Sequence, residues 1–260
     1  MSTTTKNACP SAEMSAEDHA LLLSAISERR PRKVLELGVS AGGTTALLLD
    51  SLEKDAVLYS VDICEKYYRD PSRDTGYIAA AHHDPGRHGK WVRHLGKDIA
   101  ECIEDIGGGI DFVVLDTLHA LPGEVLSFLA FLPYTGSKFA LFIHDLSLHL
   151  SCKERFLTTQ EALNGYEKNA HSNILLMGAL HGHSKTYSKE AMPNSGLAVV
   201  ERDAMIRNIF PVMNILSLQW CSVPAVDALI KTRDIVQRFY SEENLRIFDI
   251  AVKYNLSVME

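Results

Sequence analysis

The segment from Val34 to Thr45 constrains the fold of this 260-residue chain more than any other part of the sequence. It begins with a short apolar run that contains Glu36. A turn with Gly38, Gly42 and Gly43 follows and leads into an apolar run suited to a helix. Glycine lets the backbone approach a ligand closely, and the first turn of a helix offers N–H groups that have no partner within the helix. The pattern predicts a nucleotide-type cofactor at the edge of a parallel sheet.

The details of this turn favour one kind of cofactor over another. The dinucleotide fingerprint Gly-x-Gly-x-x-Gly places bare backbone against a pyrophosphate, but Ser40 occupies the second glycine position. Glu36 would also bring a second anion close to a diphosphate, whereas it suits the amino and sulfonium groups of S-adenosylmethionine, directly or through water. An ordinary turn without a cofactor is the simpler alternative. The residues of this segment that we expect to bind the cofactor are Glu36, Gly38, Ser40, Gly42, Gly43 and Thr44.

Short apolar runs alternate with helix-like segments along the chain. Strands are predicted at 33–37, 56–61, 91–95, 111–116 and 139–143, with a final pair at 174–180 and 197–200. The run at 111–116 is almost entirely apolar, which is typical of a strand covered on both faces. We therefore predict an α/β fold, namely a doubly wound, mostly parallel seven-stranded sheet with helices on both faces.

Polar residues gather at the predicted carboxyl ends of these strands, which is where a doubly wound sheet binds its ligands. Asp62 ends the second strand, at the position where a ribose diol is usually bound. Beside Glu36 and Asp62, the residues at such ends are Asp98, Asp116, His144 and Asp145.

The sequence predicts one main domain with a segment at each end. Residues 1–14 are polar and rich in Ser and Thr, so we expect a flexible tail there. Ser15 followed by Asp18 predicts a helix that starts with a capping box, and with it a main domain at 15–205. Residues 206–260 are predicted to form a helical extension packed on the same domain.

Composition narrows the class of function. The formal net charge of −7 argues against an enzyme that holds long nucleic acid through its phosphates. Five scattered cysteines with no Cys-x-x-Cys pair imply neither a zinc site nor a disulfide framework. No signal peptide or membrane span is recognisable. We expect a cytoplasmic protein that acts on a small molecule or sugar, without nucleic acid or membrane as a partner, and that could form a homodimer or larger homo-oligomer.

These motifs make the chain resemble the class I S-adenosylmethionine-dependent methyltransferases. Within that class it is similar to the small-molecule and sugar O-methyltransferases of the methyltransferase family 24 type. The resemblance rests on Glu36-Leu37-Gly38 with Gly42-Gly43, on Val61-Asp62 and, more weakly, on Gly96-Lys97-Asp98. It covers about residues 32–145 by motif, and it implies S-adenosylmethionine as cofactor, with Asp62 at the ribose and Asp98 near the adenine.

The resemblance also implies a catalytic centre and, in some relatives, a metal. Metal-dependent relatives have an Asp at the end of the fourth strand and an acidic pair at the end of the fifth. Asp116 and Asp145 match, but His144 replaces the first member of the pair. Because Mg²⁺ prefers oxygen ligands, this replacement disfavours Mg²⁺ and leaves Mn²⁺, Fe²⁺, Zn²⁺ or no metal as alternatives. We expect Asp116, His144 and Asp145 to bind a divalent metal, if one is used, and Asp116 to lie near the cofactor as well. His119 is the candidate catalytic base, and Asp116 and His144 are further candidate catalytic residues.

The resulting hypothesis is methyl transfer to a hydroxyl of a sugar, glycan precursor or other small molecule. Three alternatives stay open at this point. Two carboxylates and an imidazole could bind Fe²⁺ in a hydroxylase-like enzyme of specialised metabolism. An NAD-dependent oxidoreductase is disfavoured by Ser40 and Glu36, and a non-catalytic S-adenosylmethionine-binding protein would not need to keep all these residues.

Overall fold

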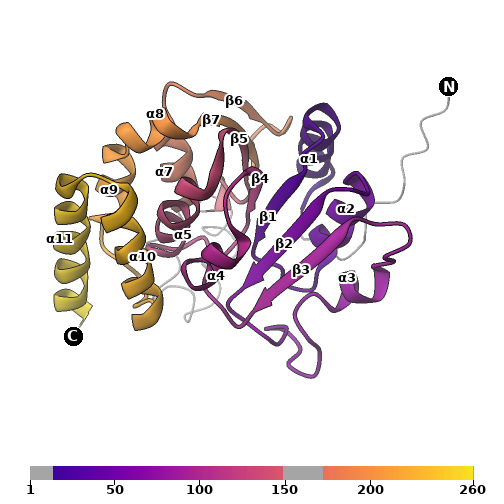
Figure 1. Cartoon of the computed structure of the whole chain (residues 1–260), viewed down its shortest axis with the longest axis horizontal. Helices are drawn as coiled ribbons and strands as arrows, with labels where there is room; N and C mark the ends of the chain where they lie inside the picture. The colour runs from indigo at the N-terminus through magenta and orange to yellow at the C-terminus, as the bar shows by residue number, and fades with distance from the viewer. Residues whose placement is uncertain (1–13, 149–171, 260) are drawn as a thin grey trace.

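The computed structural model describes residues 14–148 and 172–259, and Figure 1 shows their arrangement. A seven-stranded sheet has the order β3-β2-β1-β4-β5-β7-β6. The first five strands of that order are parallel, β7 is antiparallel to β5, and β6 is antiparallel to β7. The strands are β1 (Lys33–Leu37), β2 (Val57–Asp62), β3 (Lys90–Leu95), β4 (Ile110–Leu115), β5 (Thr135–Ile143), β6 (Ser184–Tyr187) and β7 (Gly196–Glu201).

Helices cover both faces of the sheet, so the predicted doubly wound architecture is confirmed. They are α1 (Ala16–Arg29), α2 (Gly43–Ser51), α3 (Tyr77–His82), α4 (Ile99–Ile106), α5 (Gly123–Phe131), the 3-10 turn η1 (Leu132–Tyr134), α7 (Ser172–Ala179), α8 (Arg202–Arg207), α9 (Phe210–Leu216), α10 (Val226–Phe239) and α11 (Glu242–Met259). No helix in the described ranges is both long and apolar enough to cross a bilayer.

Successive side chains of the central strands point into two separate cores, as the period of a strand requires. On β4, Val113 and Leu115 join the larger core together with α4, α5 and the C-terminal helices. Phe112 and Val114 join the smaller core together with α1 and α2. These four side chains are fully buried, which explains why the sequence of β4 is almost continuously apolar.

The two ends of the described chain belong to these cores. Met14, placed by the sequence in a flexible tail, is buried in the smaller core, while residues 1–13 lie outside the described part of the chain. At the other end, Leu229 and Val236 of α10 and Phe248 of α11 lie in the larger core beside α4 and α5. Most of the predicted 206–260 segment is therefore helical and shares the core of the sheet.

One predicted strand is wrong, and one strand was not predicted. The run 174–180 forms most of helix α7, in which Asn173, Leu176 and Met177 are buried at helical spacing. A short apolar run does not by itself distinguish a buried strand from a buried helix. Strand β6 lies at the edge of the sheet, and its sequence, Ser-Lys-Thr-Tyr, is polar and largely exposed, so it carries no hydrophobic signal.

Candidate functional site

The candidate site lies where the order of the parallel strands reverses, between β1 and β4. Leu37, Leu115 and Ile143 lie level with one another at the carboxyl ends of β1, β4 and β5. The next residue of each strand continues the contact, because the Asp116 N–H donates to the Leu37 carbonyl (2.9 Å) and the His144 N–H donates to the Leu115 carbonyl (3.1 Å). Such a switch point is the usual ligand site of a doubly wound sheet.

The glycine turn after β1 is pressed against the residue that follows β4. Gly38 has φ +88°, and a Cβ built on it would lie 1.8 Å from the carbonyl oxygen of Asp116. Only glycine fits at this position, since both the backbone angle and the space exclude a side chain. Gly42 has φ +92°, and a Cβ there would lie 2.9 Å from the Cα of Gly76 in the segment that leads into α3. The turn is therefore enclosed by β4 on one side and by this segment on the other.

Asp62 holds the backbone of the turn. Its Oδ2 accepts hydrogen bonds from the N–H groups of Val39 (2.9 Å) and Ser40 (3.2 Å), and its Oδ1 accepts one from Cys64 (2.8 Å). Ser40 has φ +52°, an uncommon conformation for a residue with a side chain. The carboxylate expected at the ribose is thus also the group that shapes the turn.

The Glu36 carboxyl lies inside the protein. It is fully buried and accepts hydrogen bonds from the hydroxyls of Thr45 (2.9 Å) and Ser60 (2.6 Å). Burial raises the pKa of Glu36 to about 8, against the opposing effect of these two hydrogen bonds. Because its oxygens face Thr45 and Ser60, Glu36 supports the turn from behind, and its contact with a cofactor stays a prediction.

Asp98 and the first residues of α2 complete the predicted cofactor set. Asp98 caps α4, with its side chain accepting from the Ala100 N–H (2.8 Å), and burial raises its pKa. Gly43 and Thr44 form the first turn of α2 directly after the glycine turn. The sequence-predicted cofactor residues, Asp116 included, therefore lie along the ends of β1, β2 and β4 and the starts of α2 and α4.

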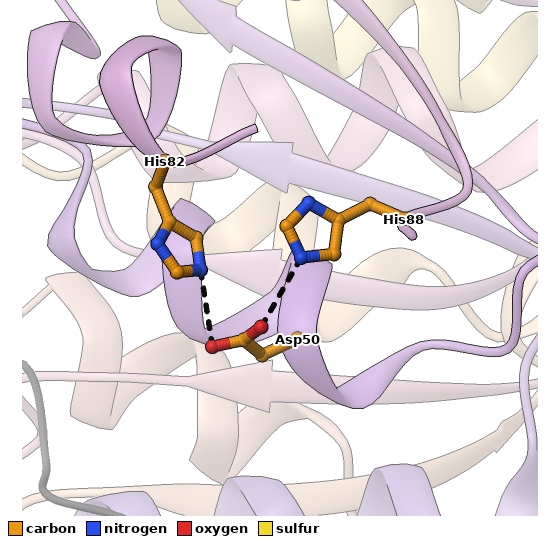
Figure 2. A group of neighbouring side chains, drawn as sticks. All are labelled: Asp50, His82 and His88. Atoms are coloured by element: carbon orange, nitrogen blue, oxygen red, sulfur yellow. Dashed lines mark hydrogen bonds and ion pairs between the residues drawn. The ribbon is translucent and has the colours of Figure 1, made fainter. Parts of the chain in front are cut away.

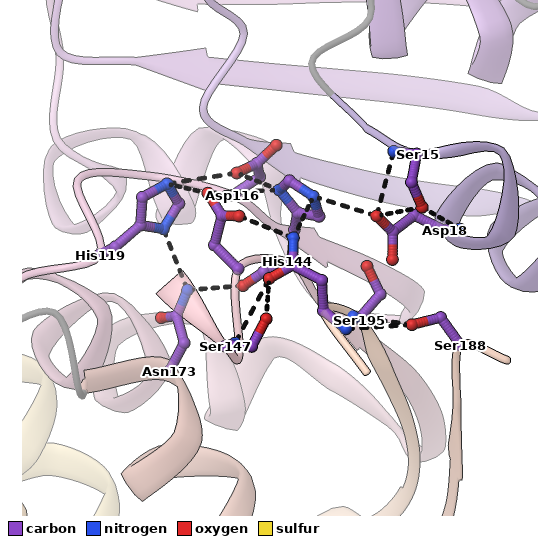
Figure 3. A network of polar contacts seen from close by, with 11 residues as sticks. Ser15, Asp18, Asp116, His119, His144, Ser147, Asn173, Ser188 and Ser195 are labelled. Atoms are coloured by element: carbon purple, nitrogen blue, oxygen red, sulfur yellow. Dashed lines mark hydrogen bonds and ion pairs between the residues drawn. The ribbon is translucent and has the colours of Figure 1, made fainter. Parts of the chain in front are cut away.

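Two histidines and two aspartates form a compact cluster beyond β4 and β5 (Figure 3). His144 Nδ1 lies 3.2 Å from Asp116 Oδ1 and 3.6 Å from Asp145 Oδ2. His119 Nε2 lies 3.0 Å from Asp145 Oδ2 and 3.5 Å from Asp116 Oδ1. The structure thus brings together all four residues that the sequence assigned to catalysis or metal binding.

The backbone around this cluster is strained at two points. His119 has φ +59° and Asp145 has φ +56°, so both residues adopt the left-handed conformation that costs energy for any residue with a side chain. Residues held in this way occur preferentially at functional sites, where the strain fixes the direction of a side chain. Here it directs both side chains to the same point, where they lie in contact.

Electrostatic contacts shift the pKa values of the histidines and of Asp145 in this cluster. Burial disfavours the charged form of His144, but the neighbouring Asp116 raises its pKa well above the usual range. Burial also opposes the charge on His119, whose pKa is nevertheless raised, chiefly by its hydrogen bond to Asp145. Against the effect of burial, the same contact and the charge of His144 lower the pKa of Asp145 to about 2. Charged imidazole and carboxylate groups therefore stabilise one another in this pocket.

Three polar side chains contact the cluster although sequence reasoning did not place them there. Asp18 of α1 lies with Oδ2 3.5 Å from His144 Nε2. The Asn173 amide nitrogen is 3.0 Å from His119 Nδ1 and donates to the His144 carbonyl (2.7 Å). Asn194 donates to Asp145 Oδ1 (2.8 Å). The capping motif predicted Asp18 only as a helix cap, and no pattern in the sequence pointed to the two asparagines.

The chemistry of the donors suits a divalent metal. Asp116, His144 and Asp145 each offer one ligand atom, and these atoms lie within 4.8 Å of one another. With Asp18 included, three carboxylates surround the His144 ring. This excess of negative charge attracts a cation, and two carboxylates with one imidazole suit Mn²⁺ or Fe²⁺ better than Mg²⁺. The residues present therefore fit such an ion.

A second histidine group lies at the other end of α2 and has a different character. His82 Nε2 and His88 Nε2 both face Asp50, at 3.1 and 3.2 Å (Figure 2). The Asp84 N–H donates to His88 Nδ1 (3.0 Å), which places the proton of a neutral His88 on Nε2. Arg87 also pairs with Asp50, at 2.9 Å. These hydrogen bonds and ion pairs connect the 77–89 segment to α2.

Comparisons with known proteins agree with this fold. Residues 35–146 match a family model described as a methyltransferase domain. The structure resembles an O-methyltransferase from Bacillus cereus in complex with SAH (TM-score 0.53, 14% identity, 74% of this chain and 84% of that one). It also resembles the O-methyltransferase TomG from Streptomyces achromogenes, involved in tomaymycin synthesis and in complex with SAM (TM-score 0.52, 16% identity, 74% and 82%). No curated protein matches the sequence.

Proposed function

We propose that this chain, which contains a methyltransferase domain of the class I fold, transfers a methyl group from S-adenosylmethionine to a hydroxyl of a sugar, glycan precursor or other small molecule. The observation that carries the proposal is the contact between the two halves of the site. The glycine turn and the aspartate–histidine cluster touch at Gly38 and Asp116, so a cofactor on the turn would present its methyl group to the cluster. The similar structures named above are O-methyltransferases, which supports oxygen as the acceptor atom.

In this proposal the residues at the turn bind the cofactor. Asp62 accepts from the ribose hydroxyls, and Asp98 lies near the adenine. Gly38, Ser40, Gly42, Gly43 and Thr44 line the methionyl part with backbone and short side chains, and Asp116 lies next to it. Glu36 fixes the shape of the turn through Thr45 and Ser60.

Methyl transfer from a sulfonium is an in-line displacement at carbon, so the enzyme must align the acceptor oxygen and remove its proton. Asp116, His144 and Asp145 would hold a divalent ion, and its chemistry there would be to lower the pKa of the acceptor hydroxyl and to orient its oxygen. His119 would accept the proton at Nε2, the ring nitrogen that faces Asp116 and Asp145. In the structure both carboxylates raise the pKa of His119, so His119 would act as a base only once a bound cation offsets their charge.

Proton transfer to Nε2 also sets a requirement on Asn173. The resting His119 must carry its proton on Nδ1, which lies against the Asn173 amide. The amide oxygen of Asn173 is buried and has no hydrogen-bond partner among the described residues. Turned towards Nδ1, it would accept that proton and hold the ring in the tautomer that a general base needs, in exchange for the hydrogen bond that the Asn173 amide nitrogen donates to the His144 carbonyl.

The proposal is tested by incubating the purified protein with methyl-labelled S-adenosylmethionine and a panel of sugars, nucleotide sugars and phenols. Reactions with Mn²⁺, with Fe²⁺ and with a chelator show whether a metal assists. Transfer of label to a hydroxyl oxygen by the wild type, and its loss in Asp116→Asn, is the expected result. A product that gains oxygen instead of a methyl group, with Fe²⁺ and O₂ present, would favour the hydroxylase alternative.

A further inference from the structure

The first helix of the domain contributes a buried carboxylate to the candidate site. Asp18 is 0% exposed, and its Oδ2 accepts hydrogen bonds from the Ser15 N–H (3.1 Å) and the Ser15 hydroxyl (2.9 Å). The same oxygen lies 3.5 Å from Nε2 of His144, a residue 126 positions further along the chain (Figure 3).

A helix cap alone does not account for this burial. The chain has a second capping box, in which Glu101 plays the same part for Asp98 at the start of α4. Glu101 is exposed, as is usual for such a residue, whereas Asp18 is fully buried. Burying a carboxylate is costly unless a cationic or hydrogen-bonding partner compensates it. Beyond its own cap, the charged partner that Asp18 contacts in the described structure is His144.

Because Asp18 contacts Nε2 of His144, Nδ1 of the same ring is free to face Asp116 and Asp145. His144 Nδ1 faces Asp116 and Asp145, at 3.2 and 3.6 Å, while Nε2 faces Asp18. The second neighbour of Nε2 is the Asn194 amide nitrogen at 3.2 Å, which carries no charge. Histidines that bind a metal through one nitrogen usually present the other to a carboxylate or a carbonyl, which fixes the tautomer and the orientation of the ring.

We propose that Asp18 is a positioning residue of the candidate site, which holds the His144 imidazole through Nε2 so that Nδ1 is presented to Asp116 and Asp145. Helix α1 is thereby part of the site. The inference rests on the proposed metal-assisted function where it concerns the role of Nδ1. The contact between Asp18 and His144 itself does not depend on a metal.

The test compares Asp18→Asn with Ser15→Ala, a matched control that weakens the same helix cap but keeps the carboxylate. Calorimetric titration with Mn²⁺ should give a dissociation constant about 10–100-fold higher for Asp18→Asn than for the wild type. Ser15→Ala should bind Mn²⁺ like the wild type. If Asp18→Asn also binds like the wild type, or both variants lose affinity equally, Asp18 is only a cap and the inference is overturned.

A second readout separates this inference from the proposed function. If the wild type does not bind Mn²⁺, the metal part of the proposed function fails. NMR of the ¹⁵N-histidine-labelled protein then tests whether Asp18 holds the His144 ring. The His144 ring signals, identified by their absence in His144→Gln, should shift in Asp18→Asn and stay unchanged in Ser15→Ala. Unchanged His144 signals in Asp18→Asn would overturn the inference.

Should Asp18→Asn fail to fold, the double variant Asp18→Asn/His144→Gln tests the pair. It removes both charges of the Asp18–His144 contact, so folding should recover to the level of His144→Gln alone, which also loses the contacts of His144 with Asp116 and Asp145. If His144→Gln folds and the double variant does not, Asp18 serves the cap alone and the inference is overturned.

Discussion

A Cβ on Gly38 would lie 1.8 Å from the carbonyl oxygen of Asp116, so the turn that follows β1 and the residue that follows β4 are in direct contact. This contact places the predicted cofactor residues next to the aspartate–histidine cluster. Even a methyl side chain at Gly38 should therefore disturb both the glycine turn and the aspartate–histidine cluster.

Gly38→Ala is expected to destabilise the protein by more than about 3 kcal/mol, because the left-handed backbone and the clash with Asp116 both cost energy. Gly109→Ala is the matched control, since Gly109 has φ +82° but no atom within 4 Å of its Cβ position. It should lose only about 1–2 kcal/mol, the cost of the backbone conformation. Urea unfolding measures both, and equal losses would show that the clash with Asp116 is absent.

Glu36 predicts how stability depends on pH. Its pKa is raised from 4.5 to about 8 in the folded protein, so the folded state binds more protons than the unfolded state between these values. The contribution of Glu36 is therefore fully present below about pH 4.5 and is lost as the pH rises through about 8, by at most about 1.4 kcal/mol per pH unit. Glu36→Gln does not titrate, so its stability relative to the wild type should increase from pH 5 to pH 9. A difference in unfolding free energy between the two proteins that stays constant from pH 5 to pH 9 would contradict the raised pKa of Glu36.

Asp62 should matter for the cofactor and not only for stability. Asp62→Asn should weaken binding of S-adenosylhomocysteine about 10-fold or more, because a carboxylate that shapes the turn and accepts from the ribose is lost. Asp111→Asn is a matched control, since Asp111 also accepts two backbone N–H groups, those of Arg32 (2.8 Å) and Lys33 (3.1 Å), at the opposite ends of the strands. Calorimetry should show normal binding for Asp111→Asn, and a similar loss in both variants would indicate a general effect on folding.

His119 should be needed for chemistry more than for cofactor binding. His119→Ala is expected to lower kcat about 10²–10⁴-fold, the usual contribution of a general base, and to leave the affinity for S-adenosylhomocysteine unchanged. His181→Ala, which changes an exposed histidine outside the cluster, should behave like the wild type in both measurements. A His119→Ala enzyme with normal kcat on its acceptor would exclude His119 as the base.

The sequence predicted the central sheet well because its strands carry their own signal. The apolar runs of β1, β4 and β5 follow from burial on both faces. The rule that ligands bind at the carboxyl ends of the strands brought Asp116, His144 and Asp145 to one place. Helix α7 and strand β6 were missed because the first is a short apolar run and the second a polar edge strand.

The roles of Asp18 and Asn173 could not be predicted, because they depend on tertiary contacts. The capping box is a local pattern, and nothing in it says that Asp18 is buried against His144, while Glu101 in the same role is exposed. Asn173 reaches His119 across 54 residues of sequence. Glu36 is a related case: its contact with the cofactor stays a prediction, and its hydrogen bonds with Thr45 and Ser60 depend on tertiary contacts that the motif does not indicate.

The central claim is that the glycine turn binds S-adenosylmethionine, and calorimetric titration of S-adenosylhomocysteine into the purified wild-type protein tests it most directly, with NAD as the control ligand. We predict binding of S-adenosylhomocysteine at micromolar concentration or tighter, and no binding of NAD. Binding of NAD alone, or of neither ligand to well-folded protein, would contradict the account.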